Sequence, residues 1–264
     1  MSKKTKFSIS LDLDNTLVCS NEDMNAFEKL ELYSNPENAI LRSRVYTISM
    51  LDVADTSGTG CKTFMWGAYR THLKKFLNFC ENYFLHCNVY SAGLPKYVES
   101  IVEVLPCSED FQPTITFNRT DCIMKPDEYG NLITNKPMDK YYSHDIYQNE
   151  IKEETTFHVD DLEETFCRDP YNGILIPAYR PSFTKEGILA DDDALLKLMA
   201  WLSLPEVMNC TDIRTLDKSK IFTTSLQEYE LRLSGKDISI SSDNMSSKPI
   251  NNQDNMHPIL LKAY

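Results

Sequence analysis

The chain has 264 residues, of which 42% are hydrophobic and 25% charged, a size and composition that suit one globular domain or a small pair. Its 27 Lys and Arg residues against 39 Asp and Glu residues give a formal net charge of -12 at pH 7. This balance argues against a non-specific binder of nucleic acid or of anionic membranes, because both functions use cationic surfaces.

The N-terminal segment has no apolar signal core, and apolar runs fall far short of the roughly 18 to 20 residues that span a membrane. We therefore expect a protein that is not secreted and not membrane-bound. The eight cysteines include no CxxC pair and no zinc-ligand cluster, which predicts reduced, mostly buried thiols.

The first half of the chain predicts a strand, a hairpin and a helix in that order. Apolar residues alternate over 6–13, which predicts a strand, and the polar stretch 21–43 predicts loop and short helix. Segments 45–50 and 62–66 flank a glycine-containing turn and predict a β-hairpin. Helical spacing of apolar residues predicts an amphipathic helix over 73–84.

The second half continues the alternation of strand and helix. A short strand is expected at 87–90, a second amphipathic helix at 94–105, and a strand pair within 114–133 that turns near 126–131. Segments 156–159 and 173–176 predict buried strands, and acidic residues mark the start of a helix near 191–193.

This order predicts an α/β fold whose mainly parallel sheet is flanked by helices and binds ligands at the carboxyl ends of its strands. The β-hairpins are then insertions on that sheet. From residue 236 onward the chain becomes rich in Ser and Asn, which predicts a disordered tail.

Asp12 and Asp14 carry the sharpest chemical signal in the sequence. They stand two residues apart directly after the first predicted strand, so both carboxylates are expected near its tip. Such a dense negative cluster is costly unless a cation or a bound group offsets it.

The segment Asp-Leu-Asp-Asn-Thr-Leu-Val at 12–18 resembles the first motif of the haloacid dehalogenase (HAD) superfamily, in the form found in the FCP/SCP-type, NLI-interacting-factor-like CTD phosphatases. The later motifs follow in order. Ser91 after the strand at 87–90 resembles the second, Lys136 in Asn-Lys-Pro-Met the third, and Asp160-Asp161 after a buried strand the fourth.

Two further segments extend the resemblance. Arg70 opens a segment similar to the family's Arg-Pro-x-Leu-x-x-Phe-Leu, although Thr71 stands where the family has proline, and Asp191-Asp192 resembles its closing helix motif. The resemblance implies a HAD-like Rossmannoid sheet with a β-hairpin insertion between the first and second motifs. The expected organisation is a phosphatase domain at 1–205, a C-terminal extension at 206–237 and the tail at 238–264.

The resemblance also implies roles for these residues. Asp12 would be the nucleophile that forms an aspartyl-phosphate, and Asp14 the general acid and base. Mg²⁺ would be held by the Asp12 carboxylate, the Asp14 backbone carbonyl and Asp161. Asp160 would lie next to these ligands without binding the metal itself. The expected phosphate-binding groups are Ser91, Lys136 and the backbone amides near Leu13 and Ala92.

The family resemblance further implies a phosphoprotein substrate, such as phosphoserine in Ser-Pro sequences of the RNA polymerase II C-terminal domain, and a nuclear or cytoplasmic location. A pocket lined by hairpin residues would bind the proline next to the phosphoserine. An equally favoured alternative is that these residues only pack the hairpin on the core. The pocket candidates are Tyr46, Ile48, Met50, Phe64 and Trp66. Because the chain is acidic, we expect Lys136 and Arg119 to supply a local positive patch that draws the phosphopeptide in.

Two other functions stay open at this point. One is a HAD phosphohydrolase that acts on a small metabolite or a nucleic-acid terminus. The other is a non-catalytic phosphoprotein-binding scaffold, against which the presence of both Asp12 and Asp14 counts.

Overall fold

A central parallel sheet organises the computed structural model, which describes residues 4–51, 62–107, 111–126, 129–130 and 132–235. Its strand order is β10-β9-β1-β5-β6, and every neighbouring pair is parallel. The strands are β1 (Ser8–Leu11), β5 (His86–Tyr90), β6 (Thr116–Phe117), β9 (Thr156–Asp160) and β10 (Gly173–Leu175). This confirms the α/β class and the mainly parallel sheet; the expected tail at 238–264 lies outside the described residues.

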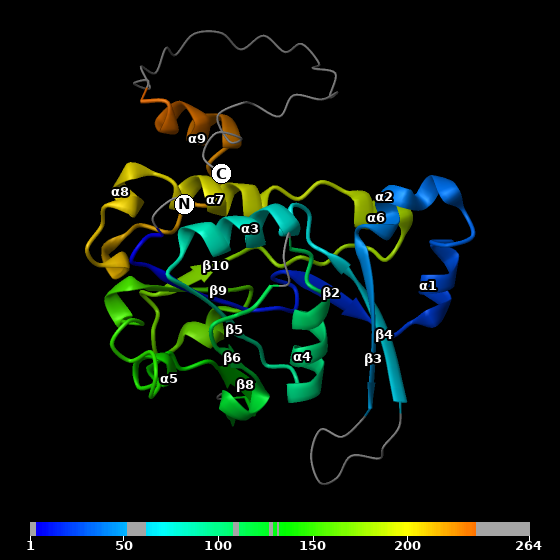
Figure 1. The fold of residues 1–264 in the computed structure, drawn as a ribbon, viewed down its shortest axis with the longest axis horizontal. Coiled ribbons are helices and arrows are strands. Elements are labelled where there is room, and N and C mark those ends of the chain that lie inside the picture. Colours follow the sequence, from blue (N-terminus) through cyan, green and yellow to red (C-terminus); the bar gives the residue numbers. More distant parts are fainter. Residues whose placement is uncertain (1–3, 52–61, 108–110, 127–128, 131, 236–264) are drawn as a thin grey trace.

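The two faces of this sheet differ in polarity because successive side chains of a strand point to opposite sides. Phe7, Ile9 and Leu11 share one core with apolar residues of α3 (Leu73–Tyr83), α4 (Pro95–Val104) and α7 (Ala194–Leu202). Figure 1 shows α3 and α7 running next to each other along the sheet. The opposite face carries buried polar groups, among them Ser10, whose hydroxyl lies 3.0 Å from that of Tyr141 in α5 (Asp139–Tyr142).

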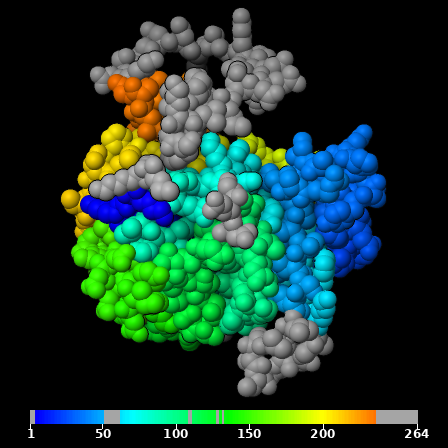
Figure 2. Space-filling model, in the orientation of Figure 1, coloured from blue at the N-terminus to red at the C-terminus, as the bar shows by residue number. Residues whose placement is uncertain are grey.

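The predicted hairpin belongs to a second, antiparallel sheet with the order β2-β4-β3. Its strands are β2 (Val18–Asn21), β3 (Val45–Leu51) and β4 (Lys62–Tyr69), of which β2 was not expected from the sequence. The hairpin projects from the main sheet in Figure 1, with α1 (Met24–Lys29), α2 (Ala39–Arg42) and α6 (Lys185–Leu189) on its outer side. In Figure 2 the blue residues of this region form a lobe at one end of the molecule.

The strand pair expected within 114–133 is arranged differently. The segment first adds β6 to the edge of the main sheet, and only then forms the antiparallel pair β7 (Ile123–Pro126) and β8 (Leu132–Asn135). Between β6 and β7, Asn118 and Asp121 form a reciprocal capping box around a short 3-10 turn. That turn separates two strands that apolar periodicity alone reads as one.

Residues beyond α7 continue into the same core. After α8 (Pro205–Met208) and before α9 (Leu226–Leu233), Ile213 and Ile221 are buried, and Tyr229 of α9 is 1% exposed. All three belong to the core cluster that contains α3 and α7. The expected domain boundary at residue 205 stays a prediction.

Two general expectations can be compared with the described part of the chain. Within it, no helix combines the length and the apolar character that crossing a membrane requires. The cysteines at 19, 80, 87, 107, 122, 167 and 210 are free thiols there, but only Cys80 and Cys87 are buried, so the expectation of mostly buried thiols was wrong for these residues.

Candidate active site

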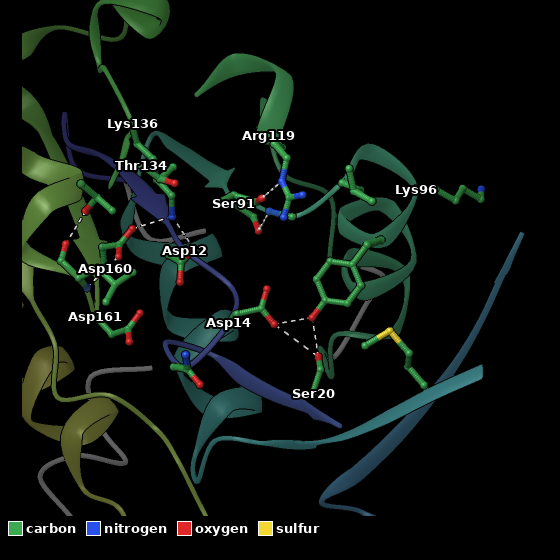
Figure 3. Close-up of a pocket in the computed structure, with 18 of the residues that line it drawn as sticks. Asp12, Asp14, Ser20, Ser91, Lys96, Arg119, Thr134, Lys136, Asp160 and Asp161 are labelled. Carbon is green, nitrogen blue, oxygen red and sulfur yellow. Dashed lines mark hydrogen bonds and ion pairs between the residues drawn. The ribbon is translucent and has the colours of Figure 1, made fainter. Parts of the chain in front are cut away.

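The carboxyl ends of the three central strands meet at one cavity of about 560 Å³. Asp12 follows β1, Ser91 follows β5 and Asp160 ends β9, so the parallel sheet brings together residues that are far apart in the sequence. Asp14, Lys136 and Asp161 line the same cavity (Figure 3). Every side chain to which the sequence assigned catalysis, metal binding or phosphate binding is therefore at this one place.

Asp12 and Lys136 form a buried ion pair. Lys136 Nζ lies 2.5 Å from Asp12 Oδ1 and 2.6 Å from Asp160 Oδ2, and the lysine is only 3% exposed. Burial lowers the pKa of Lys136, but the two carboxylates more than offset it and leave the pKa above its ordinary value. Burial raises the pKa of Asp12 to about 6, with Lys136 opposing the shift. Lys136 therefore stays cationic where a phosphoryl group would face Asp12.

Asp160 and Asp161 have different surroundings although they are neighbours. Asp160 Oδ2 pairs with Lys136, and Asp160 Oδ1 accepts a hydrogen bond from the Leu162 amide at 3.0 Å. Asp161 Oδ2 is buried without a hydrogen-bond partner, and its nearest cation is the exposed Arg180 at 3.5 Å. Asp160 is thus held by protein groups, whereas Asp161 has an oxygen left for a ligand.

The carboxylates at this cavity fit a hard divalent cation. Oxygen atoms of Asp12, Asp160 and Asp161 lie within 4.8 Å of one another. Carboxylate oxygens are the ligands that Mg²⁺ prefers. Asp161 Oδ2 has no hydrogen bond and only the exposed Arg180 beside it, so a bound cation would satisfy this oxygen. Mg²⁺ therefore fits the residues present.

Asp14 is held by hydroxyl groups rather than by a cation. The Tyr97 hydroxyl of α4 donates to Asp14 Oδ1, and Ser20 of β2 donates to the same oxygen at 3.4 Å. Burial, followed by the charge of Asp12, raises the pKa of Asp14 to about 6. A carboxyl group with such a pKa can both give and take a proton near neutral pH. Sequence reasoning missed Ser20 and Tyr97 as partners of Asp14, because β2 was not predicted and Tyr97 fitted the apolar pattern of its helix.

Ser91 and nearby backbone amides provide hydrogen-bond donors. Ser91 Oγ accepts the Gly93 amide at 3.0 Å, which fixes the hydroxyl and leaves its hydrogen for a ligand. Among the hydrogen bonds of the described residues, the amides of Leu13 and Ala92 donate to no protein acceptor. Arg119 lines the cavity and donates through Nε to the Ala92 carbonyl at 2.8 Å.

The expected substrate pocket is only partly formed by the residues assigned to it. Met50 lines the cavity, whereas Tyr46 and Ile48 are buried at 4% and 5% exposure behind it. Phe64 and Trp66 pack against Phe27, away from the cavity.

The pleat of the hairpin explains this division. Met50 pairs with Thr63 and Ile48 with Met65, and paired residues share one face of the sheet. The cavity accordingly takes Thr63 and Met65 from β4, neither of which was proposed. Phe64 and Trp66 lie on the opposite face because they alternate with these two residues.

Arg70 braces the loop that carries the two catalytic candidates. It is 1% exposed, forms two contacts of 3.0 Å with the Asp192 carboxylate, and donates to the carbonyls of Thr16 at 3.0 Å and Pro177 at 2.7 Å. The two segments that the resemblance added to the motifs thus meet in one ion pair, in which Arg70 is buried and Asp192 is partly exposed.

The fold and the site together define an α/β protein with an acidic centre at the carboxyl ends of its parallel strands. The family model described as NLI interacting factor-like phosphatase matches residues 7–214, and the chain belongs to this family. The description of this family is that of a phosphatase. No curated protein sequence gives a significant match.

Solved structures with a similar arrangement include two of the phosphatase Fcp1. One is fission yeast RNA polymerase II CTD phosphatase Fcp1 bound to beryllium fluoride, at 14% identity and a TM-score of 0.47, covering 73% of this chain and 48% of that one. The other is Fcp1 described as an essential RNA polymerase II CTD phosphatase, at 16% identity and a TM-score of 0.48, covering 94% of this chain and 58% of that one. The chain thus spans about half the length of these two structures.

Proposed function

We propose that this protein is a Mg²⁺-dependent serine/threonine phosphatase that acts on phosphoproteins through an aspartyl-phosphate on Asp12. The observation that supports it most is the convergence of Asp12, Asp14, Lys136 and Asp161 on one cavity of a chain that belongs to a phosphatase family.

In the first step the Asp12 carboxylate attacks phosphorus. The bond between phosphorus and the serine oxygen breaks, its electron pair stays on that oxygen, and the oxygen takes a proton from the Asp14 carboxyl group. Lys136, Ser91 and the amides of Leu13 and Ala92 bind the phosphoryl oxygens and offset their charge.

In the second step Asp14, now a carboxylate, takes a proton from water. The water oxygen attacks phosphorus, the bond to Asp12 breaks, and inorganic phosphate leaves while Asp12 returns to a carboxylate. Mg²⁺ bound by Asp12, the Asp14 carbonyl and Asp161 would supply charge neutralisation between the carboxylates and the phosphoryl group.

The substrate class that we propose is phosphoserine or phosphothreonine in an extended segment, such as the Ser-Pro sequences of the RNA polymerase II C-terminal domain. The cavity rim supports a protein substrate, because Leu94 and Leu162 at its edge are each 39% exposed and leave the site accessible from solvent. A metabolite phosphatase remains the second enzyme hypothesis.

The test is hydrolysis of phosphorylated heptad peptides against a panel of phosphorylated metabolites, with Mg²⁺ and with a chelator. We expect peptide turnover that requires Mg²⁺ and that Asp12→Asn abolishes. Turnover confined to metabolites would show that the substrate is a metabolite and not a phosphoprotein. Full activity of Asp12→Asn would refute the mechanism. Asp14→Asn is expected to turn over slowly and to accumulate an aspartyl-phosphate visible by mass.

A further inference from the structure

A chain of three hydroxyl groups leads away from Asp14 into the hairpin. The Ser20 oxygen lies 2.5 Å from the Tyr97 hydroxyl oxygen and 2.7 Å from that of Tyr46. Tyr46 is 4% exposed and does not line the cavity, so it meets Asp14 only through Ser20. Figure 3 shows Ser20 and Asp14 joined on this side of the cavity, away from Lys136.

Gly67 gives Tyr46 the space to reach Ser20. Gly67 of the middle strand pairs with Ser20 on one side and with Tyr46 on the other, so the three residues share one rung of the β2-β4-β3 sheet. A Cβ atom on Gly67 would lie 2.4 Å from the Tyr46 hydroxyl oxygen and 2.5 Å from the ring carbon that bears it. The Tyr46 ring therefore lies across the middle strand in space that any side chain would fill.

The hydrogens of these hydroxyls have one consistent direction. Tyr97 donates its single hydrogen to Asp14, and Ser20 donates its own to Asp14 or to the Tyr97 oxygen. The hydrogen between Tyr46 and Ser20 must then come from Tyr46. Tyr46 thereby fixes the Ser20 hydroxyl in the rotamer that points toward the catalytic carboxyl group.

Both hydroxyl contacts of Asp14 fall on the same oxygen, Oδ1. Oδ2 is the other oxygen of the carboxyl group, and in the described residues no hydrogen bond to it is formed. The hydroxyl chain thus orients the carboxyl group while it leaves one oxygen to exchange a proton with a substrate.

We propose that Tyr46, acting through Ser20, is a positioning residue that aims Asp14 at the leaving-group oxygen; this rests on the function proposed above for Asp14. Tyr46 does not bind the substrate in this arrangement. Its loss is expected to weaken proton donation, and the loss should grow as the leaving group becomes more basic, because poor leaving groups depend most on the acid.

The experiment measures kcat/KM of the full chain with Mg²⁺ on a series of aryl phosphates of rising leaving-group pKa and on a phosphoserine peptide. Tyr46→Phe keeps the ring and removes the hydroxyl. We expect less than a twofold loss on p-nitrophenyl phosphate and roughly fivefold or more on phenyl phosphate and the peptide. Ser20→Ala should give the same pattern, and Ser20→Thr should retain most of the activity.

The matched control is Tyr229→Phe, which removes another buried hydroxyl. That hydroxyl donates to the Ile221 carbonyl at 2.9 Å, and neither residue lines the active-site cavity. It is expected to leave the whole series unchanged. The double variant of Tyr46→Phe and Ser20→Ala should lose no more than the worse single variant, because both break one chain.

Three results would overturn the proposal: equal losses on all leaving groups, no loss at all, or additive losses in the double variant. If Tyr46→Phe does not fold, Ser20→Ala and Ser20→Thr decide by the same criterion. A wild-type protein that hydrolyses none of these phosphates would instead refute the proposed function, and the positioning role with it.

Discussion

At the scale of single residues, the site combines four acidic side chains with one buried cation. Lys136 contacts two of the carboxylates. The pKa of Asp12 nevertheless stays above its ordinary value, because burial raises it more than the ion pair with Lys136 lowers it. The remaining negative charge explains why a divalent cation would bind here. It also makes that binding sensitive to protons, because only the deprotonated carboxylate is a ligand.

We therefore predict that Mg²⁺ binding weakens on acidification. With the pKa of Asp12 raised to about 6, its protonated fraction is small at pH 7 and dominant at pH 5. The apparent Mg²⁺ affinity should fall roughly tenfold between these two values, as calorimetric titration of the metal-free protein would show. Asp161→Asn should remove most of the binding at both pH values. An affinity that is equal at pH 5 and pH 7 would contradict this assignment.

At the scale of elements, two tertiary contacts decide what surrounds these residues. The pleat of β3 and β4 sends Met50, Thr63 and Met65 to the cavity and sends Phe64 to the opposite face. Arg70, just after β4, ties the loop that follows β1 to Asp192, which precedes α7. Each contact leads to its own prediction.

Met50→Ala should weaken recognition of peptides more than it weakens chemistry. Met50 is the one residue of the expected pocket that lines the cavity, and its truncation removes apolar surface beside a bound segment. We expect KM for a Ser-Pro phosphopeptide to rise about threefold to tenfold, with kinetics on a small aryl phosphate nearly unchanged. Equal losses on both substrates would remove the pocket role.

Arg70→Met should destabilise the fold strongly. It leaves the partly exposed Asp192 carboxylate and two carbonyl oxygens without their buried cationic donor. The free energy of unfolding, measured by denaturant titration, is expected to fall by about 3 kcal/mol or more.

Arg214→Met provides the control for that measurement. Arg214 pairs with Asp212 and Glu153 but keeps 31% of its side chain exposed, so its loss should cost less than about 1 kcal/mol. Equal costs for Arg70 and Arg214 would show that burial of the Arg70 pair contributes little.

At the scale of the whole molecule, the residues before and after 205 share one core. Ile213, Ile221 and Tyr229 are each at most 1% exposed and pack in the cluster that includes α7. Lys197 of α7 also donates to the Phe222 carbonyl at 3.1 Å. The family model itself continues to residue 214.

A chain that ends at residue 235 keeps these buried residues and is therefore expected to unfold cooperatively, whereas one that ends at 205 should not. Each large apolar side chain that loses its burial costs roughly 1.5 to 3 kcal/mol, and a domain has only about 5 to 15 kcal/mol in total. Calorimetric melting of the two truncated chains makes the comparison. A cooperative transition in the shorter chain would support the boundary predicted at 205.

The sequence by itself determined the fold class, the family resemblance and the group of Asp12, Asp14, Ser91, Lys136 and Asp161, because these residues stand at or near strand ends or in compact motifs that local order preserves. The tertiary structure decided which face each hairpin residue occupies, since the pairing register sets it and no local signal reports it. It also decided the partners of Asp14. Ser20, Tyr46 and Tyr97 come from three different elements, and the close approach over Gly67 gives the Tyr46 hydroxyl the space to reach Ser20.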